Sequence, residues 1–340
     1  FIVDKQLFIW QLPDFFLRTA SFVSYARKDD LQDELKEYLA RPDRKRVVVM
    51  FGNSRTTTFS NEYIEQTHPN SILFNFSVPG GTADYYLYRL QLFAKEHIKP
   101  DHIFLAVSPQ GLNATPSIAM DEVMLEGLSL GFVARNFYNY RPDHITNYLA
   151  KKTFWIYQYR PKIATIAHRL ENNHKEAREF RYFLAKEQSS LKAERGSVKL
   201  DFKIKPPQDP DFLKHSAEGT WRDFLSPFTP DQGQIDFMER SLAECNQQQL
   251  QCTMLWTRVG PNLRHILKTR GLKAQPDRSV HTWFKELTKA MGSRHHIELL
   301  DLNDDGAMQC DYFFDSSHMA SYCFPEMTDK LFEKLDRKQN

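Results

Sequence analysis

The sequence predicts an α/β fold in which a doubly wound parallel sheet of five strands carries a helical insertion. Short, uninterrupted apolar runs such as 47–51 and 103–107 are typical of strands buried on both faces of a parallel sheet. Segments with helical spacing separate these runs, and such alternation indicates right-handed βαβ units. The length of 340 residues, 41% of them hydrophobic, allows a large core. Strands are expected at 47–51, 72–78, 103–107, 253–257 and 297–302.

Four parts follow from this pattern. Residues 1–45 form an N-terminal segment, and residues 46–116 form the first half of the sheet. Residues 117–195 contain no strand candidate and are predicted to be a helical insertion, either a cap over the site or a set of solvated structural helices. Residues 196–340 begin with a proline-rich, irregular connection and complete the sheet. Helices are expected at 29–39, 60–66, 84–96, 145–159, 163–191, 234–248, 262–268 and 280–291.

The first ten residues suggest a membrane-proximal segment. Asp4 and Lys5 precede an apolar stretch that ends at Trp10, and tryptophan and basic residues favour the membrane interface. We therefore expect a membrane anchor ahead of Phe1, or else an amphipathic helix packed on the domain. The 45 basic and 43 acidic residues nearly cancel, so charge predicts no nucleic-acid partner.

The four cysteines do not make a disulfide scaffold, but they form two local pairs. Cys245 and Cys252 join a predicted helix to a strand, while Cys310 and Cys323 bracket a polar loop near the end of the chain. Each pair could be bridged in an oxidising compartment, or all four thiols could be reduced and buried. Neither pair has the spacing of metal ligands.

Ser54 is the candidate nucleophile. It follows Gly52 and Asn53 directly after the first predicted strand, at the edge where open α/β sheets place their ligands. The alternative is that these small residues only form a turn and a helix cap. A serine nucleophile needs a base and an acid that orients it, and Asp315 and His318 offer both before the last predicted helix.

Two further segments supply candidate oxyanion donors. Gly80 follows the second predicted strand and Asn113 follows the third. In this order along the chain, the motifs around Ser54, Gly80, Asn113 and Asp315 with His318 resemble those of the SGNH (GDSL-like) hydrolase superfamily. The resemblance implies a flavodoxin-like sheet, with Ser54 as nucleophile, Gly80 and Asn113 as oxyanion donors and the Asp315–His318 pair completing a triad.

Two positions depart from the SGNH motifs, and another family resembles the chain more closely. Asn53 stands where the first SGNH motif usually has Asp, and Ala114 stands where an Asp often follows the oxyanion asparagine. The Gly-x-Ser-Arg motif and the hydrophobic opening ending in Asp-Lys are similar to those of a bacterial membrane-anchored SGNH-like family of unassigned function. The chain also resembles, more distantly, the alginate O-acetyltransferases.

These resemblances imply a serine esterase or an O-acyltransferase that acts on an ester, such as acetyl groups on a carbohydrate of the cell envelope, in the periplasm or envelope. The alternative is a catalytically silent SGNH-like domain used for binding or assembly in an envelope complex. Arg55, next to Ser54, is predicted to bind a substrate carboxylate or phosphate, or else to form a salt bridge to the helical region. No metal and no cofactor are predicted: residues 168–174 suggest a solvated face, and 301–306 make an incomplete calcium loop.

Overall fold

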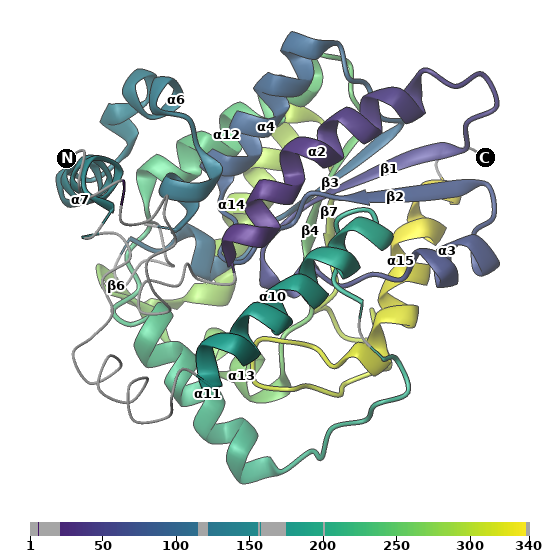
Figure 1. The fold of residues 1–340 in the computed structure, drawn as a ribbon. Helices are drawn as coiled ribbons and strands as arrows, with labels where there is room; N and C mark the ends of the chain where they lie inside the picture. Colours follow the sequence, from purple (N-terminus) through teal and green to yellow (C-terminus); the bar gives the residue numbers. More distant parts are fainter. Residues whose placement is uncertain are drawn as a thin grey trace.

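The computed structural model describes Gln6 and residues 21–114, 122–155, 157, 175–199 and 201–337. Its centre is one five-stranded, all-parallel sheet in the order β2–β1–β3–β4–β7 (Figure 1). The predicted fold class is therefore confirmed, and every predicted strand overlaps an observed one. The strands are β1 (Arg46–Phe51), β2 (Ser71–Asn75), β3 (His102–Ala106), β4 (Cys252–Trp256) and β7 (Leu299–Asp301).

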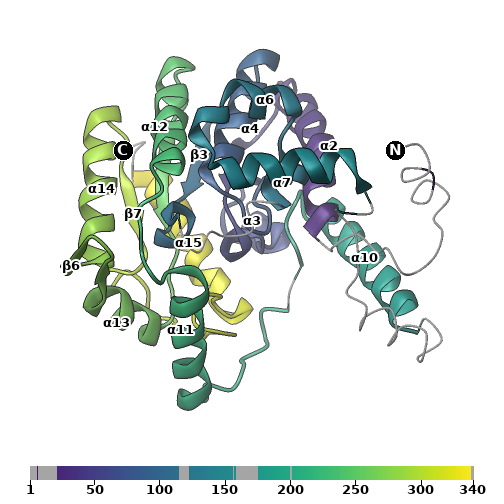
Figure 2. The ribbon, with the colours of Figure 1, turned by 90° about the vertical axis from the view of Figure 1, so that its left-hand side faces the viewer.

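Helices cover both faces of the sheet, as Figures 1 and 2 show. Alternate residues of β1 divide between two hydrophobic clusters, with Val47, Val49 and Phe51 in one and Val48 and Met50 in the other. Burial on both faces explains why the strand is apolar throughout. One face carries α2 (Ser21–Leu39), α4 (Ala83–Glu96), α12 (Gln232–Gln247) and α14 (Val280–His295), and the other carries α3 (Asn61–Thr67) and α15 (Phe324–Arg337).

A buried lysine joins three parts of the fold. Lys28 of α2 donates hydrogen bonds to the carbonyl of Asn75 at the end of β2 (2.7 Å) and to that of Gly196, beyond the insertion helix α10 (Lys175–Ala193) (2.8 Å). Burial lowers the pKa of Lys28 well below its ordinary value. A neutral amine still has two N–H groups for these two carbonyls, so the contact survives loss of the charge.

The helical insertion lies between β3 and β4, and α10 packs along α2. Beyond the predicted insertion, the structure differs from the prediction at residues 210–224, where helix α11 (Pro210–Phe224) replaces part of the expected irregular connection. Pro210 occupies the first turn of α11, where a proline starts a helix instead of breaking it, and Asp209 caps that end. The other described elements of the insertion are η3 (Val123–Gly127), α6 (Leu130–Arg135), η4 (Phe137–Asn139) and α7 (Pro142–Thr153).

A second element is absent from the prediction, a short antiparallel pair of strands, β5 (Gly271–Leu272) and β6 (Gln275–Ser279). It lies between α13 (Pro261–Thr269) and α14. The predicted membrane-proximal residues 1–5 and 7–10 and the polar face at 168–174 lie outside the described residues. Within the ranges that are described, no helix combines the length and apolar character needed to cross a bilayer.

Both cysteine pairs form disulfides, so the bridged alternative holds. Cys245–Cys252 fastens the end of α12 to the start of β4. Cys310–Cys323 closes the segment that contains Asp315 and His318.

Candidate active site

The segments with predicted site residues meet at the carboxyl edge of the sheet. Ser54, Gly80 and Asn113 follow β1, β2 and β3, and His318 lies beyond β7. The strand order reverses direction between β1 and β3, and this switch point is where doubly wound sheets bind ligands. A cavity of only about 10 Å³, enough for about one water, lies at this edge. Asn53, Gly81 and Gly111 are among the residues that line it, so the loops after β1, β2 and β3 meet beside Ser54.

Ser54 begins a single turn of 3₁₀ helix, η1 (Ser54–Thr56), that directly follows β1. The side chain of Asn53 accepts the Arg55 N–H (3.1 Å) and caps this turn, which gives a structural reason for the asparagine. A Cβ at Gly52 would lie 1.9 Å from Thr56 Oγ1, so any larger residue here would force the side chain of Thr56 to move. As a result Ser54 is exposed while Arg55 and Thr56 are buried.

The segment after β2 packs against this turn. The hydroxyls of Thr56 and Ser77 lie 2.8 Å apart, and the Val78 N–H donates to the Gly52 carbonyl (3.1 Å). A Cβ at Gly81 would approach that same carbonyl to 2.3 Å. Gly80 has a φ of 69°, in the left-handed region that favours glycine. Among the described residues the Gly80 N–H has no hydrogen-bond partner, as a free oxyanion donor requires.

The Asp315–His318 loop is held as a tight turn. Phe313 pairs with Met319 in an isolated antiparallel bridge, and the Phe314 N–H donates to the His318 carbonyl (2.9 Å). Ser316, inside the turn, is anchored from several sides. Its N–H donates to Ser216 Oγ (2.9 Å), its hydroxyl contacts Thr220 (2.8 Å), and its carbonyl accepts from Gly260 (2.8 Å). Helix α11, absent from the sequence prediction, therefore supports this loop.

The three predicted triad residues are in hydrogen-bond contact. Ser54 Oγ lies 2.8 Å from His318 Nε2, and His318 Nδ1 lies 2.8 Å from Asp315 Oδ2. A carboxylate only accepts hydrogen bonds, so the proton belongs on Nδ1 and Nε2 is left to accept the Ser54 hydroxyl. The His318 side chain is 40% exposed, so a substrate can approach it from solvent.

Asp315 does more than orient the imidazole. Its Oδ1 accepts the backbone N–H groups of Ser317 (2.7 Å) and His318 (2.8 Å). Burial acts to raise the pKa of Asp315, but the hydrogen bond and charge of His318 and the two N–H groups outweigh it and hold the pKa below its ordinary value. The side chain therefore stays a carboxylate at neutral pH.

Asp311 is a supporting residue that the sequence did not single out. Its carboxylate binds Arg258 (3.0 Å) and Arg264 (2.8 Å), and so joins the start of the Asp315–His318 loop to the segment after β4 and to the first half of α13. Burial acts to raise the pKa of Asp311, but both arginines outweigh it and lower that pKa. These ion pairs could not be foreseen from the sequence, because both arginines lie far from Asp311 along the chain.

Asn113 lies at the expected edge, but its amide also has a structural task. The amide nitrogen donates to the Phe224 carbonyl (3.0 Å), and the amide oxygen accepts the Thr229 N–H (2.8 Å). The side chain thus secures the return of the chain from α11. Its role as an oxyanion donor stays a prediction.

The comparisons with known proteins give a family for nearly the whole chain. Residues 1–335 match the profile of a family described as "Protein of unknown function (DUF1574)". The chain belongs to the DUF1574 family. No curated protein matches it. In this DUF1574 member, Ser54, His318 and Asp315 form one chain of hydrogen-bond contacts.

The disulfide Cys310–Cys323 gives a first test of that geometry. In the double variant Cys310→Ser, Cys323→Ser, we expect the free energy of unfolding to fall by about 2–4 kcal/mol. We also expect kcat for an aryl acetate to fall, because the bridge closes the loop that positions His318. Urea unfolding and steady-state kinetics measure the two effects.

The matched control is the variant Cys245→Ser, Cys252→Ser. Its bridge lies at the start of β4, at the amino edge of the sheet. This variant should lose stability and keep its kcat. Equal kcat values in the two double variants would contradict a positioning role for Cys310–Cys323.

Proposed function

We propose that this chain is a serine esterase or O-acyltransferase of the SGNH type, with Ser54 as nucleophile, His318 as general base and Asp315 as the residue that orients it. The observation that carries the proposal is the unbroken chain of two 2.8 Å contacts from Ser54 through His318 to Asp315. A serine hydroxyl is a weak nucleophile at neutral pH, and this arrangement is what activates it.

The reaction would proceed in two halves. Ser54 Oγ attacks the ester carbonyl while its proton passes to His318 Nε2. The tetrahedral intermediate collapses, the C–O bond to the leaving alcohol breaks, and His318 returns the proton to that alcohol. In the second half, water or an acceptor hydroxyl attacks the acyl-enzyme and gives its proton to His318, which passes it to the departing Ser54 oxygen. Water as acceptor makes an esterase, and a sugar hydroxyl makes an acyltransferase.

The oxyanion would be held by the backbone N–H groups of Ser54 and Gly80, with the Asn113 amide as a third donor. Gly80 supports this role because its N–H is unpaired within the described residues and its left-handed backbone is fixed beside the Ser54 turn. Removing a single donor of this kind costs about 2.7–4 kcal/mol of transition-state stabilisation.

The proposed setting is the cell envelope, with an acetylated carbohydrate as the ester substrate. Two disulfides support an oxidising compartment, because such bonds persist outside the reducing cytosol. The resemblance to alginate O-acetyltransferases supports the carbohydrate. The competing function is that of a catalytically silent binding domain. The two functions differ in whether the Ser54 hydroxyl reacts with an ester or an ester-like probe.

The deciding experiment is labelling of the folded protein with a fluorophosphonate, which needs only an activated hydroxyl and an oxyanion pocket. Ser54 Oγ should bond to phosphorus with loss of fluoride, and peptide mass mapping should place the adduct on Ser54. An unlabelled, well-folded protein that also leaves aryl acetates intact would favour the silent binding domain. A protein that is labelled at Ser54 but hydrolyses aryl acetates only slowly, and that turns them over faster when a polyol acceptor is added, would be identified as an acyltransferase.

A further inference from the structure

Arg55 differs from the other buried arginines in the described part of the chain, because it has no carboxylate partner. Its side chain and backbone together are only 8% exposed. No nitrogen of its guanidinium makes a hydrogen bond or ion pair within the described residues, and Nη1 is fully enclosed. The other buried arginines are paired: Arg27 with Glu34, Arg89 with Asp29, and Arg258 with Asp311.

A buried, unpaired guanidinium is costly to the fold. Burial lowers the pKa of Arg55 to about 10, although the charge of the nearby Asp315 acts to raise it. The group is therefore still charged at neutral pH. Asp315 does not compensate it directly, because the Asp315 oxygens accept from His318 and from two backbone N–H groups. The alternative of a salt bridge to the helical region finds no such pair among the described residues.

A second buried group without partners lies at the same edge. Gln110 is in η2 (Pro109–Leu112), just beyond β3, as Arg55 is in η1, just beyond the neighbouring strand β1. Gln110 is 3% exposed, and within the described residues neither the nitrogen nor the oxygen of its amide has a hydrogen-bond partner. Unsatisfied buried polar groups are rare in folded proteins, and here two lie just beyond the two strands that flank the switch point.

We propose that Arg55 binds an anionic group, a carboxylate or a phosphate, on the ester that Ser54 attacks. This inference rests on the proposed function and narrows it to charged esters. The guanidinium presents N–H groups in a fork that matches both kinds of anion, and such charge-assisted bonds are strong where water is excluded. Because η1 places Arg55 next to Ser54 and Asn53 fixes the turn, the bound anion would set the position of the ester.

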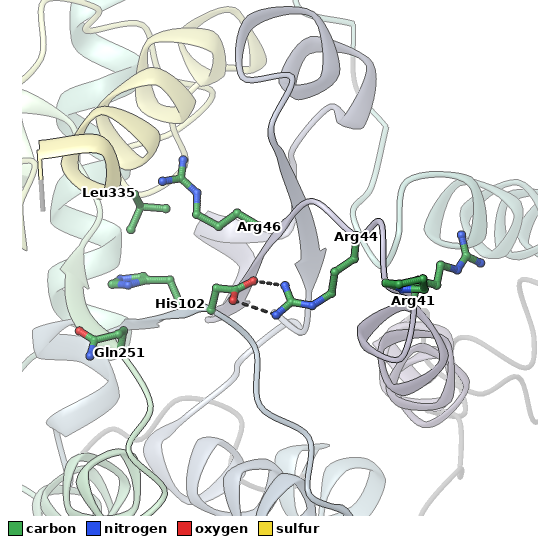
Figure 3. A pocket seen from close by; sticks show the side chains of 8 residues that line it. Arg41, Arg44, Arg46, His102, Gln251 and Leu335 are labelled. Atoms are coloured by element: carbon green, nitrogen blue, oxygen red, sulfur yellow. Dashed lines mark hydrogen bonds and ion pairs between the residues drawn. The ribbon is translucent and has the colours of Figure 1, made fainter. Parts of the chain in front are cut away.

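A different basic site must be controlled for. A pocket of about 560 Å³ lies at the amino edge of the sheet. Figure 3 shows side chains that line it, among them Arg41, Arg44 and Arg46. There Arg44 forms hydrogen bonds with Asp101, as the dashed lines mark. Arg46 forms hydrogen bonds with Ser71 and Asp336, whose side chains the figure does not draw. Arg41 is exposed, so Arg41→Gln removes one positive charge from this pocket without touching the site at Ser54.

The kinetic test compares matched esters. The substrates are 4-acetoxybenzoate, its neutral methyl ester and 4-acetoxyphenyl phosphate, with each rate divided by spontaneous hydrolysis. We expect the wild type to favour at least one anionic ester over the neutral one by roughly 10- to 100-fold in kcat/KM. Arg55→Gln should remove this preference, Arg55→Lys should keep part of it, and Arg41→Gln should leave it unchanged. Which of the two anionic esters the wild type favours shows whether Arg55 binds a carboxylate or a phosphate.

A binding test makes the result independent of catalysis. Millimolar inorganic phosphate or benzoate should raise the Tm of the wild type and of Arg41→Gln, but not that of Arg55→Gln. Without added anion, Arg55→Gln should melt at the same temperature as the wild type or higher, because it removes an unpaired buried charge. An arginine with a merely structural role would instead lower the Tm when replaced.

Two results would overturn the inference. One is an unchanged preference for anionic esters in Arg55→Gln, and the other is a wild type that neither anion stabilises. If Ser54 is not labelled and no ester reacts, the proposed function fails, and the thermal shifts still decide whether Arg55 is an anion site.

Discussion

Replacing Ser54 with alanine is expected to lower kcat for aryl acetate hydrolysis by roughly 10⁴- to 10⁶-fold, the range seen when a triad nucleophile is removed. The physical reason is that His318 would have no hydroxyl to activate, while the oxyanion donors and the turn stay in place. Ser54 is exposed and its side-chain contact is with His318, so the variant should fold normally. Steady-state kinetics and circular dichroism measure both expectations.

The matched control is Ser293→Ala, at another exposed serine, on α14 near the opposite edge of the sheet. It should label with the fluorophosphonate and turn over esters like the wild type. Residual activity of Ser54→Ala within tenfold of the wild type would show that a different group attacks the ester.

The second large effect is expected from Asp315→Asn, which should lower kcat by about 10⁴-fold without unfolding the loop. The Asn oxygen can still accept the N–H groups of Ser317 and His318, so the turn survives. The Asn amide would, however, donate to His318 Nδ1 and force the ring proton onto Nε2. Nε2 could then no longer accept the Ser54 proton.

Asp311→Asn is the control for this variant, since it makes the same chemical change in the same segment. Asp311 contacts Arg258 and Arg264 and not His318, so its replacement should lower the free energy of unfolding and lower kcat far less than Asp315→Asn does, because the ring of His318 keeps its tautomer. Kinetics and urea unfolding of both variants should thus give opposite patterns. If Asp315→Asn lost stability and kept its kcat, Asp315 would be only a structural residue.

The sheet could be predicted because each strand carries its own signal. Val47 to Phe51 is apolar at every position, since alternate residues face two different clusters. The missed elements carry misleading signals or none. Pro210 starts α11 but resembles a helix breaker in a proline-rich stretch. β6 is polar and has no buried residue, so it lacks the apolar pattern of a strand.

The three residues Ser54, Asp315 and His318 could be predicted because a serine nucleophile needs a base and an acid. In addition, each of the segments that carry them follows a predicted strand, at the same edge of the sheet. Ser54 and His318 are 264 residues apart, yet the parallel sheet brings both to one edge. The contacts that hold the loop could not be foreseen, because Ser216, Thr220 and Asp311 are ordinary polar residues until their neighbours in space are known. The lack of an ion-pair partner for Arg55 among the described residues could not be foreseen either, because it depends on which side chains the fold brings near the guanidinium.

Asp315 binds the backbone of His318 with one oxygen and its ring with the other. Acid and base therefore move as a single rigid body. Any disturbance of the loop that leaves this turn intact shifts the imidazole as a whole and lengthens the gap to Ser54, while the ring keeps its tautomer. If the proposed esterase activity holds, damage to the supports of the loop should consequently slow ester turnover at every pH by a similar factor, and the shape of the pH–rate curve should stay the same.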